Sequence, residues 1–248
     1  MCVITLHPHI LWDCKVLDHD AQQMKNLILK SFGGLVFLFV VIAVLLFLPA
    51  GTFNFWQAWV FLAVFFGAAL AITLDLMKND QKLLEKRVAA GPAAEKLISE
   101  KIIQSITSVW FISMLVVPGF DHRFGWSLMP FSLSLAGDAL VAFAFLIIFL
   151  VFKENSFTSA TIELQSEQKV ISTGLYKLVR HPMYMGGFIL FVGMSLALGS
   201  WWDFALFAVV MPALIWRLFD EEKFLKKNLL GYTKYAKKVK YHLIPLVW

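Results

Sequence analysis

Two short motifs in the C-terminal half of the chain carry side chains that can act on a ligand. The first reads Arg180-His181-Pro182-Met183-Tyr184-Met185-Gly186-Gly187, and the second reads Arg217-Leu218-Phe219-Asp220-Glu221-Glu222. Arg217 and Glu221 are four residues apart, so they share one helix face, with Glu222 next to it. Arginine offers a rigid fork for a carboxylate or a phosphate. The acids can hold an amino group or a ribose hydroxyl, so the two motifs together are suited to binding a charged ligand.

These motifs lie at the ends of two apolar runs, 183–198 and 204–219, which are separated by residues 199–203. At about 1.5 Å per residue, each run spans roughly 22–24 Å, the length of a short membrane crossing. Two crossings joined by so short a turn must be antiparallel. We therefore expect His181 and Tyr184 to lie close to the Arg217 motif at one membrane boundary.

The composition predicts an all-α, polytopic integral membrane protein. Of the 248 residues, 59% are hydrophobic and only 16% are charged, whereas a soluble domain has about a quarter charged residues. About six transmembrane helices are expected, the last two forming a C-terminal helical hairpin followed by a cytoplasmic segment. The six apolar segments are 32–49, 53–74, 102–118, 126–152, 183–198 and 204–219.

The positive charges predict the orientation of these crossings. With six crossings, 21 of the 22 lysine and arginine residues fall on the same side of the membrane, and only Arg123 falls on the other. The positive-inside rule then places both termini in the cytoplasm. The net charge of +5 is explained by this topology, so no nucleic-acid partner is expected. The two cysteines, Cys2 and Cys14, provide neither a metal site nor a disulfide framework.

The chain divides into three regions of one domain. Residues 1–31 form a polar, irregular cytoplasmic tail, in which Met24 is a candidate initiator and 1–23 a candidate upstream extension. Residues 32–125 hold the N-terminal crossings and an amphipathic loop, 78–101. This loop is expected to lie as a helix in the inner interface and to end at Gly91-Pro92. Residues 126–248 hold the two motifs.

Several polar residues allow two interpretations. His181 before Pro182 can bind a ligand at a helix start or be an ordinary interfacial histidine. Asp138, inside the fourth crossing, is either functional or hydrogen-bonded to a neighbouring helix. Glu154 and Asn155 are either ligand groups or interfacial polar residues. The basic, tyrosine-containing tail after Gly231 either meets anionic lipid or folds back as a lid.

The order of motifs in residues 126–248 resembles the isoprenylcysteine carboxyl methyltransferase family and the related membrane phospholipid methyltransferases. The pattern is Gly174-Leu175-Tyr176-x3-Arg180-His181-Pro182-x-Tyr184-x-Gly186, then Arg217-x3-Glu221-Glu222, then Gly231-Tyr232-x2-Tyr235-x3-Val239 and Pro245. Residues 24–125 are similar to the family only in being membrane helices. The spacing from Gly231 to Tyr235 is shorter than in the eukaryotic members, so their substrate does not carry over directly.

The resemblance implies that S-adenosylmethionine is the methyl donor and that a lipophilic acceptor comes from the bilayer. The acceptor would be the carboxylate of an isoprenylcysteine-like molecule or a lipid amine. Arg217 would hold the acceptor's reacting group, and Glu221 and Glu222 complete the implied catalytic set. By position, the cofactor contacts would be Val170, Ile171, Tyr176, His181, Pro182, Met183, Tyr184, Tyr235, and Glu221 or Glu222.

Two other functions are compatible with the same sequence. Membrane sterol and enone reductases have a similar C-terminal half with an Arg-His motif, and they use NADPH. The doubled acid at 221–222 and the His-Pro-x-Tyr-x-Gly order favour the methyltransferase. A non-catalytic membrane protein with a structural hairpin is the other alternative, and the convergence of the two motifs argues against it.

Overall fold

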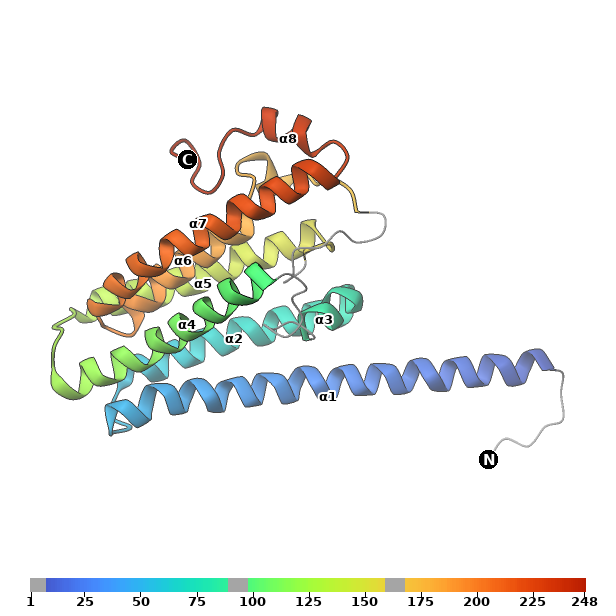
Figure 1. Cartoon of the computed structure of the whole chain (residues 1–248). Helices are drawn as coiled ribbons and strands as arrows, with labels where there is room; N and C mark the ends of the chain where they lie inside the picture. The colour runs from blue at the N-terminus through green and yellow to red at the C-terminus, as the bar shows by residue number, and fades with distance from the viewer. Residues whose placement is uncertain (1–7, 89–97, 159–167) are drawn as a thin grey trace.

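The chain folds into a bundle of long helices (Figure 1). The computed structural model describes residues 8–88, 98–158 and 168–248, with side chains from residue 22 onward except those of residues 98–100 and 104, and no β-strand occurs in these ranges. The elements are α1 (Pro8–Ala50), α2 (Trp56–Asn79), α3 (Gln81–Val88), α4 (Ile98–Phe124), α5 (Phe131–Glu154), the 3₁₀ helix η2 (Gly174–Lys177), α6 (Pro182–Ala197), α7 (Trp202–Asn228) and α8 (Tyr232–Lys238).

Five of these helices are long and apolar enough to cross a membrane. They are Gln22–Ala50 within α1, α2, Lys101–Phe124 within α4, α5 and α7. Helix α6 is apolar but has only 16 residues, about 24 Å at the rise of an α-helix. The predicted all-α membrane fold is confirmed. The expected fifth crossing, 183–198, corresponds to α6, which is not among the five helices long enough to span, so the count of six crossings stays a prediction.

Helix α1 begins much earlier than the sequence predicted. The tail 1–31 was expected to be irregular, but the helix starts at Pro8. Proline is well suited to the first helical position, and no glycine or further proline follows until Gly33, so nothing interrupts the helix there. Figure 1 shows that the first part of α1 extends beyond the bundle.

The predicted interfacial helix is present in part. Helix α3 covers Gln81–Val88 of the predicted segment 78–101, while its predicted end at Gly91-Pro92 lies outside the described residues. The two leucines of α3, Leu83 and Leu84, are 0% and 4% exposed. The helix therefore packs on the bundle through one face.

Glycines bring α5 and α6 into close contact. A Cβ atom on Gly137 would lie 2.2 Å from the backbone nitrogen of Ala197, and one on Gly193 would lie 2.9 Å from that of Val141. Small residues at such positions let membrane helices approach backbone to backbone. Helix α6 consequently packs much more extensively on α5 than on α7.

The helices alternate in direction, so the bundle has two distinct ends. At one end, Asp121 accepts hydrogen bonds of 2.6 Å from the Ser127 backbone N–H and from the hydroxyls of Ser127 and Ser200. These contacts tie α4 to the loops before α5 and α7. The other end holds α3, α8, the C-termini of α2, α5 and α7, and the N-terminus of α6. We call it the cavity end, because both predicted motifs lie there and a cavity opens between them.

Candidate active site

A cavity of about 280 Å³ opens at the cavity end, close to the lower limit of typical small-molecule sites. Its lining includes Arg217 and every residue expected to contact the cofactor except Glu222. These are Val170, Ile171, Tyr176, His181, Pro182, Met183, Tyr184, Glu221 and Tyr235. The two motifs therefore meet around one space, as the antiparallel arrangement of α6 and α7 predicted.

Tyr184 and Glu221 link the two motifs directly. The Tyr184 hydroxyl, in the first turn of α6, donates a 2.7 Å hydrogen bond to Oε2 of Glu221 on α7. Arg217, one turn before Glu221, also lies beside this hydroxyl. A phenol, a carboxylate and a guanidinium thus share one wall of the cavity, and this group can orient a polar reactant and exchange a proton with it.

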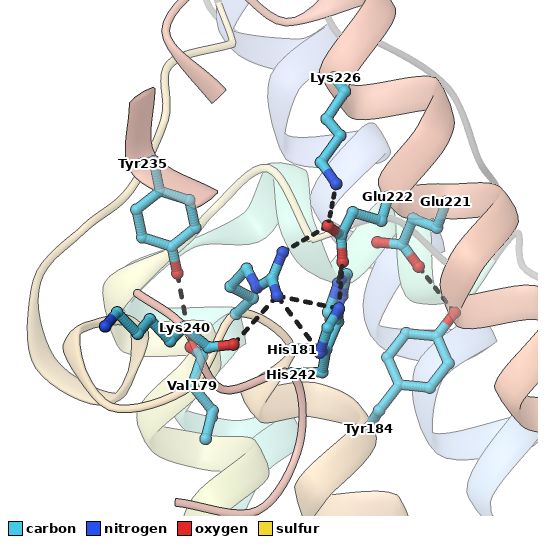
Figure 2. Close-up of polar contacts among 10 residues, drawn as sticks. Val179, His181, Tyr184, Glu221, Glu222, Lys226, Tyr235, Lys240 and His242 are labelled. Atoms are coloured by element: carbon cyan, nitrogen blue, oxygen red, sulfur yellow. Dashed lines mark hydrogen bonds and ion pairs between the residues drawn. The ribbon is translucent and has the colours of Figure 1, made fainter. Parts of the chain in front are cut away.

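The neighbouring acid, Glu222, points elsewhere (Figure 2). It is 2% exposed and pairs through Oε1 with Arg180 and, at 2.5 Å, with Lys226. Its Oε2 lies 3.1 Å from His242 Nε2 and 3.6 Å from His181 Nε2. Glu222 does not line the cavity. The structure therefore separates the two acids, with Glu221 facing the cavity and Glu222 in a buried ion cluster behind it.

The ion cluster holds the C-terminal segment against the start of α6. The backbone N–H groups of Arg180 and His181 donate to the carbonyls of Tyr241 and His242, at 2.9 and 3.0 Å. Arg180 Nη2 also donates to the Lys240 carbonyl at 3.1 Å. The C-terminal segment is thus anchored by backbone hydrogen bonds and by the ion pairs of the cluster.

Tyrosines build a second wall of the cavity. Asn155 Nδ2 donates to the Tyr176 hydroxyl at 2.9 Å, and the Tyr235 hydroxyl donates to the Tyr176 carbonyl at 2.8 Å. Burial raises the pKa of Tyr176 to about 12 and that of Tyr235 above its usual range. The phenols are therefore neutral hydrogen-bonding groups at physiological pH. Asn155, which allowed two interpretations, lies in this wall.

The loop carrying Tyr176 is shaped by a glycine. Gly174 has a positive φ of 45°, and a Cβ atom there would lie 2.0 Å from the Glu154 carboxylate. That carboxylate accepts a 2.7 Å hydrogen bond from the Thr173 hydroxyl. Glu154 therefore supports the loop and does not line the cavity.

Asp138 lies apart from this site. It is 5% exposed within α5 and is not among the cavity residues. Neither carboxylate oxygen has a hydrogen-bond partner in the described part of the chain. The expected alternative, a hydrogen bond to a neighbouring helix, does not occur among those residues.

An apolar groove of about 180 Å³ lies between α6 and α7, next to the cavity. Met183 and Tyr184 line both spaces. The rest of the groove is formed by large apolar side chains, among them Phe188, Phe191, Met211, Leu214 and Ile215. It exists because α6 packs closely on α5 and leaves its α7 side less covered.

Some cavity residues were not predicted as site residues. They include Arg87, Thr158, Lys169 and Tyr232. Tyr232 stands in the motif that begins at Gly231, so a signal for it was present in the sequence. Arg87 follows Leu83 and Leu84 by four and three residues, and this helical spacing places it on the packed face of α3.

Comparison with known proteins finds similarity to membrane methyltransferases. Residues 133–230 match the family model described as phospholipid methyltransferase. The chain is also 34% identical over 92 residues to proteins of Oryza sativa subsp. indica and subsp. japonica that are named "Probable protein-S-isoprenylcysteine O-methyltransferase". Each match covers 34% of this chain and 46% of the rice protein, so the chain matches just under half the length of these relatives. The chain is therefore similar to membrane methyltransferases over residues 133–230, which span α6, α7 and most of the cavity wall.

Proposed function

We propose that the protein is an S-adenosylmethionine-dependent integral membrane methyltransferase that acts on a lipophilic acceptor. The observation that supports this most strongly is the junction of two unlike spaces at Met183 and Tyr184. One space is a polar cavity with tyrosines and charged groups, and the other is an apolar groove. A polar donor and an apolar acceptor would meet at this junction.

The cavity has chemistry that fits the donor. S-adenosylmethionine supplies a methyl group on a cationic sulfonium. Glu221 is the only acid among the described lining residues of the cavity, and a carboxylate and aromatic faces both favour a nearby cation. The phenols of Tyr176 and Tyr235 lie in the same lining, and Tyr232 adds a buried hydroxyl with no partner in the described part of the chain.

Arg217 and Glu221 would handle the acceptor. For a carboxylate acceptor, the Arg217 fork aligns the two oxygens and no proton needs to be removed. For a lipid amine, Glu221 accepts the proton directly or through water, and Tyr184 keeps that carboxylate in place. In both cases the protein contributes positioning and the exclusion of water, which suits a direct displacement.

Glu222 would be a positioning residue in this proposal. It would hold Arg180, and through it the C-terminal segment, so that the cavity keeps its shape. The charge asymmetry of the loops further supports a cavity end that faces the cytoplasm, where a soluble donor is available.

Two measurements test this function on the full chain in detergent or nanodiscs. Calorimetry with S-adenosylhomocysteine and with NADPH should give binding of the first only. Transfer of tritium from methyl-labelled S-adenosylmethionine into native membrane lipid should then label a lipophilic product that can be identified. Binding of NADPH alone would favour a reductase, and binding of neither ligand would contradict the proposal.

A further inference from the structure

The N-terminal half of the chain also contributes a wall of the cavity. Leu83 and Leu84 of α3 pack in a cluster with Phe152 near the end of α5. Met183 of α6 packs against the same cluster. This contact places the next turn of α3 at the cavity, where Arg87 is part of the lining. Residue 87 lies outside the region 133–230 that matches the methyltransferase family.

Arg87 is a partly buried cation whose guanidinium has a hydrogen-bond donor that no described residue uses. Its guanidinium stacks over the Phe152 ring, 4.5 Å from the centroid, and Nη2 donates to the Thr158 carbonyl at 3.3 Å. Its Nε is buried and has no partner in the ranges that the structure describes. Burial lowers the pKa of Arg87 to about 10, so the group remains charged at physiological pH.

The other cavity arginines already have neighbours of their own. Arg180 is paired with Glu222, and Arg217 lies beside Tyr184 and Glu221. No acidic residue in the described part of the chain forms an ion pair with Arg87. A desolvated guanidinium in a ligand cavity is suited to binding an oxyanion, because its planar fork matches a carboxylate.

The position of Arg87 indicates which oxyanion this would be. Arg87 contacts Thr158, and the Tyr176 phenol is close enough to affect it electrostatically. Neither Thr158 nor Tyr176 lines the apolar groove, which meets the cavity at Met183 and Tyr184. The acceptor would come from the groove side, so the anion near Arg87 would belong to the donor.

We propose that Arg87 binds the carboxylate of the amino-acid end of S-adenosylmethionine. Helix α3 would then complete the donor site from outside residues 133–230, the range that matches the family model. This inference rests on the proposed function. Arg87 would then fix one end of the donor, while Glu221 and Arg217 lie on the wall where the acceptor arrives.

The test is a binding measurement that needs no acceptor. The dissociation constants of S-adenosylhomocysteine and of its decarboxylated analogue, which lacks only the carboxylate, are measured by calorimetry. The proteins are the wild type, Arg87→Met, Arg87→Lys and the control Lys82→Met, an exposed cation on the same helix. Methionine keeps the length of the stem against Phe152 and removes the charge, and melting temperatures verify that each variant is folded.

Arg87→Met should weaken S-adenosylhomocysteine binding about 10- to 100-fold, the range expected when a hydrogen bond to a charged group is lost. It should leave binding of the decarboxylated analogue nearly unchanged. Arg87→Lys should give an intermediate loss for the first ligand, and Lys82→Met should give none for either.

Two results would overturn this inference and leave the proposed function standing. One is wild-type affinity of Arg87→Met for S-adenosylhomocysteine, and the other is an equal loss for both ligands, which would indicate a packing role. If the wild type binds neither ligand, both the role of Arg87 and the proposed function are wrong. The two failures are therefore distinguishable.

Discussion

The Tyr184 hydroxyl donates a 2.7 Å hydrogen bond to the Glu221 carboxylate, from the first turn of α6 to the last part of α7. The two residues are 37 positions apart, and their contact lies where the polar cavity meets the apolar groove. The carboxylate is therefore held by a neutral donor at the place where donor and acceptor would react.

Tyr184→Phe should lower kcat/KM for methyl transfer about tenfold or more. The change removes a hydrogen bond to a charged group, which contributes about 1.5–3 kcal/mol, and leaves Glu221 less well oriented. The ring still packs, so the melting temperature should fall by no more than about 3–12 °C, the shift that this energy produces in a chain of this size. Tritium transfer into membrane lipid measures the effect, with Tyr241→Phe as the control because Tyr241 does not line the cavity. Unchanged transfer in Tyr184→Phe would contradict the role of this contact.

Glu221→Gln should lower methyl transfer, whereas Glu222→Gln should lower stability. Removing one partner of a buried ion pair costs about 3–5 kcal/mol, so Glu222→Gln should lower the melting temperature by roughly 6–20 °C. Glu221 faces the cavity, so Glu221→Gln should keep the melting temperature and lose methyl transfer. Differential scanning fluorimetry and tritium transfer on both variants separate the roles. A stable but inactive Glu222→Gln would show that the assignment of the two acids is reversed.

Arg217→Lys should reduce methyl transfer about 10- to 100-fold and leave S-adenosylhomocysteine affinity nearly unchanged. Lysine keeps the charge but cannot reproduce the planar fork that aligns a reacting group, and the range corresponds to about 1.4–2.8 kcal/mol. Lys223→Arg, an exposed substitution six residues along α7, is the matched control. Full turnover in Arg217→Lys would exclude a bidentate contact from the mechanism.

The meeting of the two motifs could be predicted because it follows from topology. Two apolar runs joined by five residues must return to the same side, whatever the detailed packing. The structure places Tyr184 against Glu221 and His181 near Glu222, as that argument requires. The direction of each helix and the class of fold follow from the same hydrophobic pattern.

The separate roles of Glu221 and Glu222 could not be predicted in this way. Adjacent residues on a helix point about 100° apart, so the one facing the cavity depends on the rotation of α7. That rotation is set by packing and by the buried cluster around Arg180, which links residues far apart in sequence. The resemblance to the methyltransferase family does not decide between the two acids either, because the acidic run varies within that family.

The contribution of α3 could not be predicted for a related reason. The segment reads as an amphipathic interfacial helix, and its lysines are exposed as expected. Its place in the bundle is set by Leu83 and Leu84, which pack in one cluster with Leu27 of α1, Leu76 of α2 and Phe152 of α5. The helical spacing puts Arg87 on the same face as these leucines, but only this tertiary packing reveals that this face borders the cavity.

His242 should make the stability of the C-terminal segment depend on pH. Burial and the nearby Arg180 lower the pKa of His242 below its usual value, an effect that Glu222 partly opposes and that His181 and Lys226 add to. The unfolded imidazole titrates near 6.5, so below about pH 6.5 the unfolded chain binds more protons than the folded one. The contribution of His242 to stability is therefore complete above that pH and is lost as the pH falls toward the folded pKa.

The comparison of wild type with His242→Gln at pH 7.5 and 5.5 measures this contribution. Glutamine keeps an acceptor for Arg180, which donates to the His242 ring at 2.9 Å, but it does not titrate. Between pH 7.5 and pH 5.5, the melting temperature of the wild type should fall more than that of the variant. Only the wild type has an imidazole at this position that the unfolded state protonates more readily than the folded state. Equal losses in the two proteins would show that His242 does not govern the acid sensitivity of this segment.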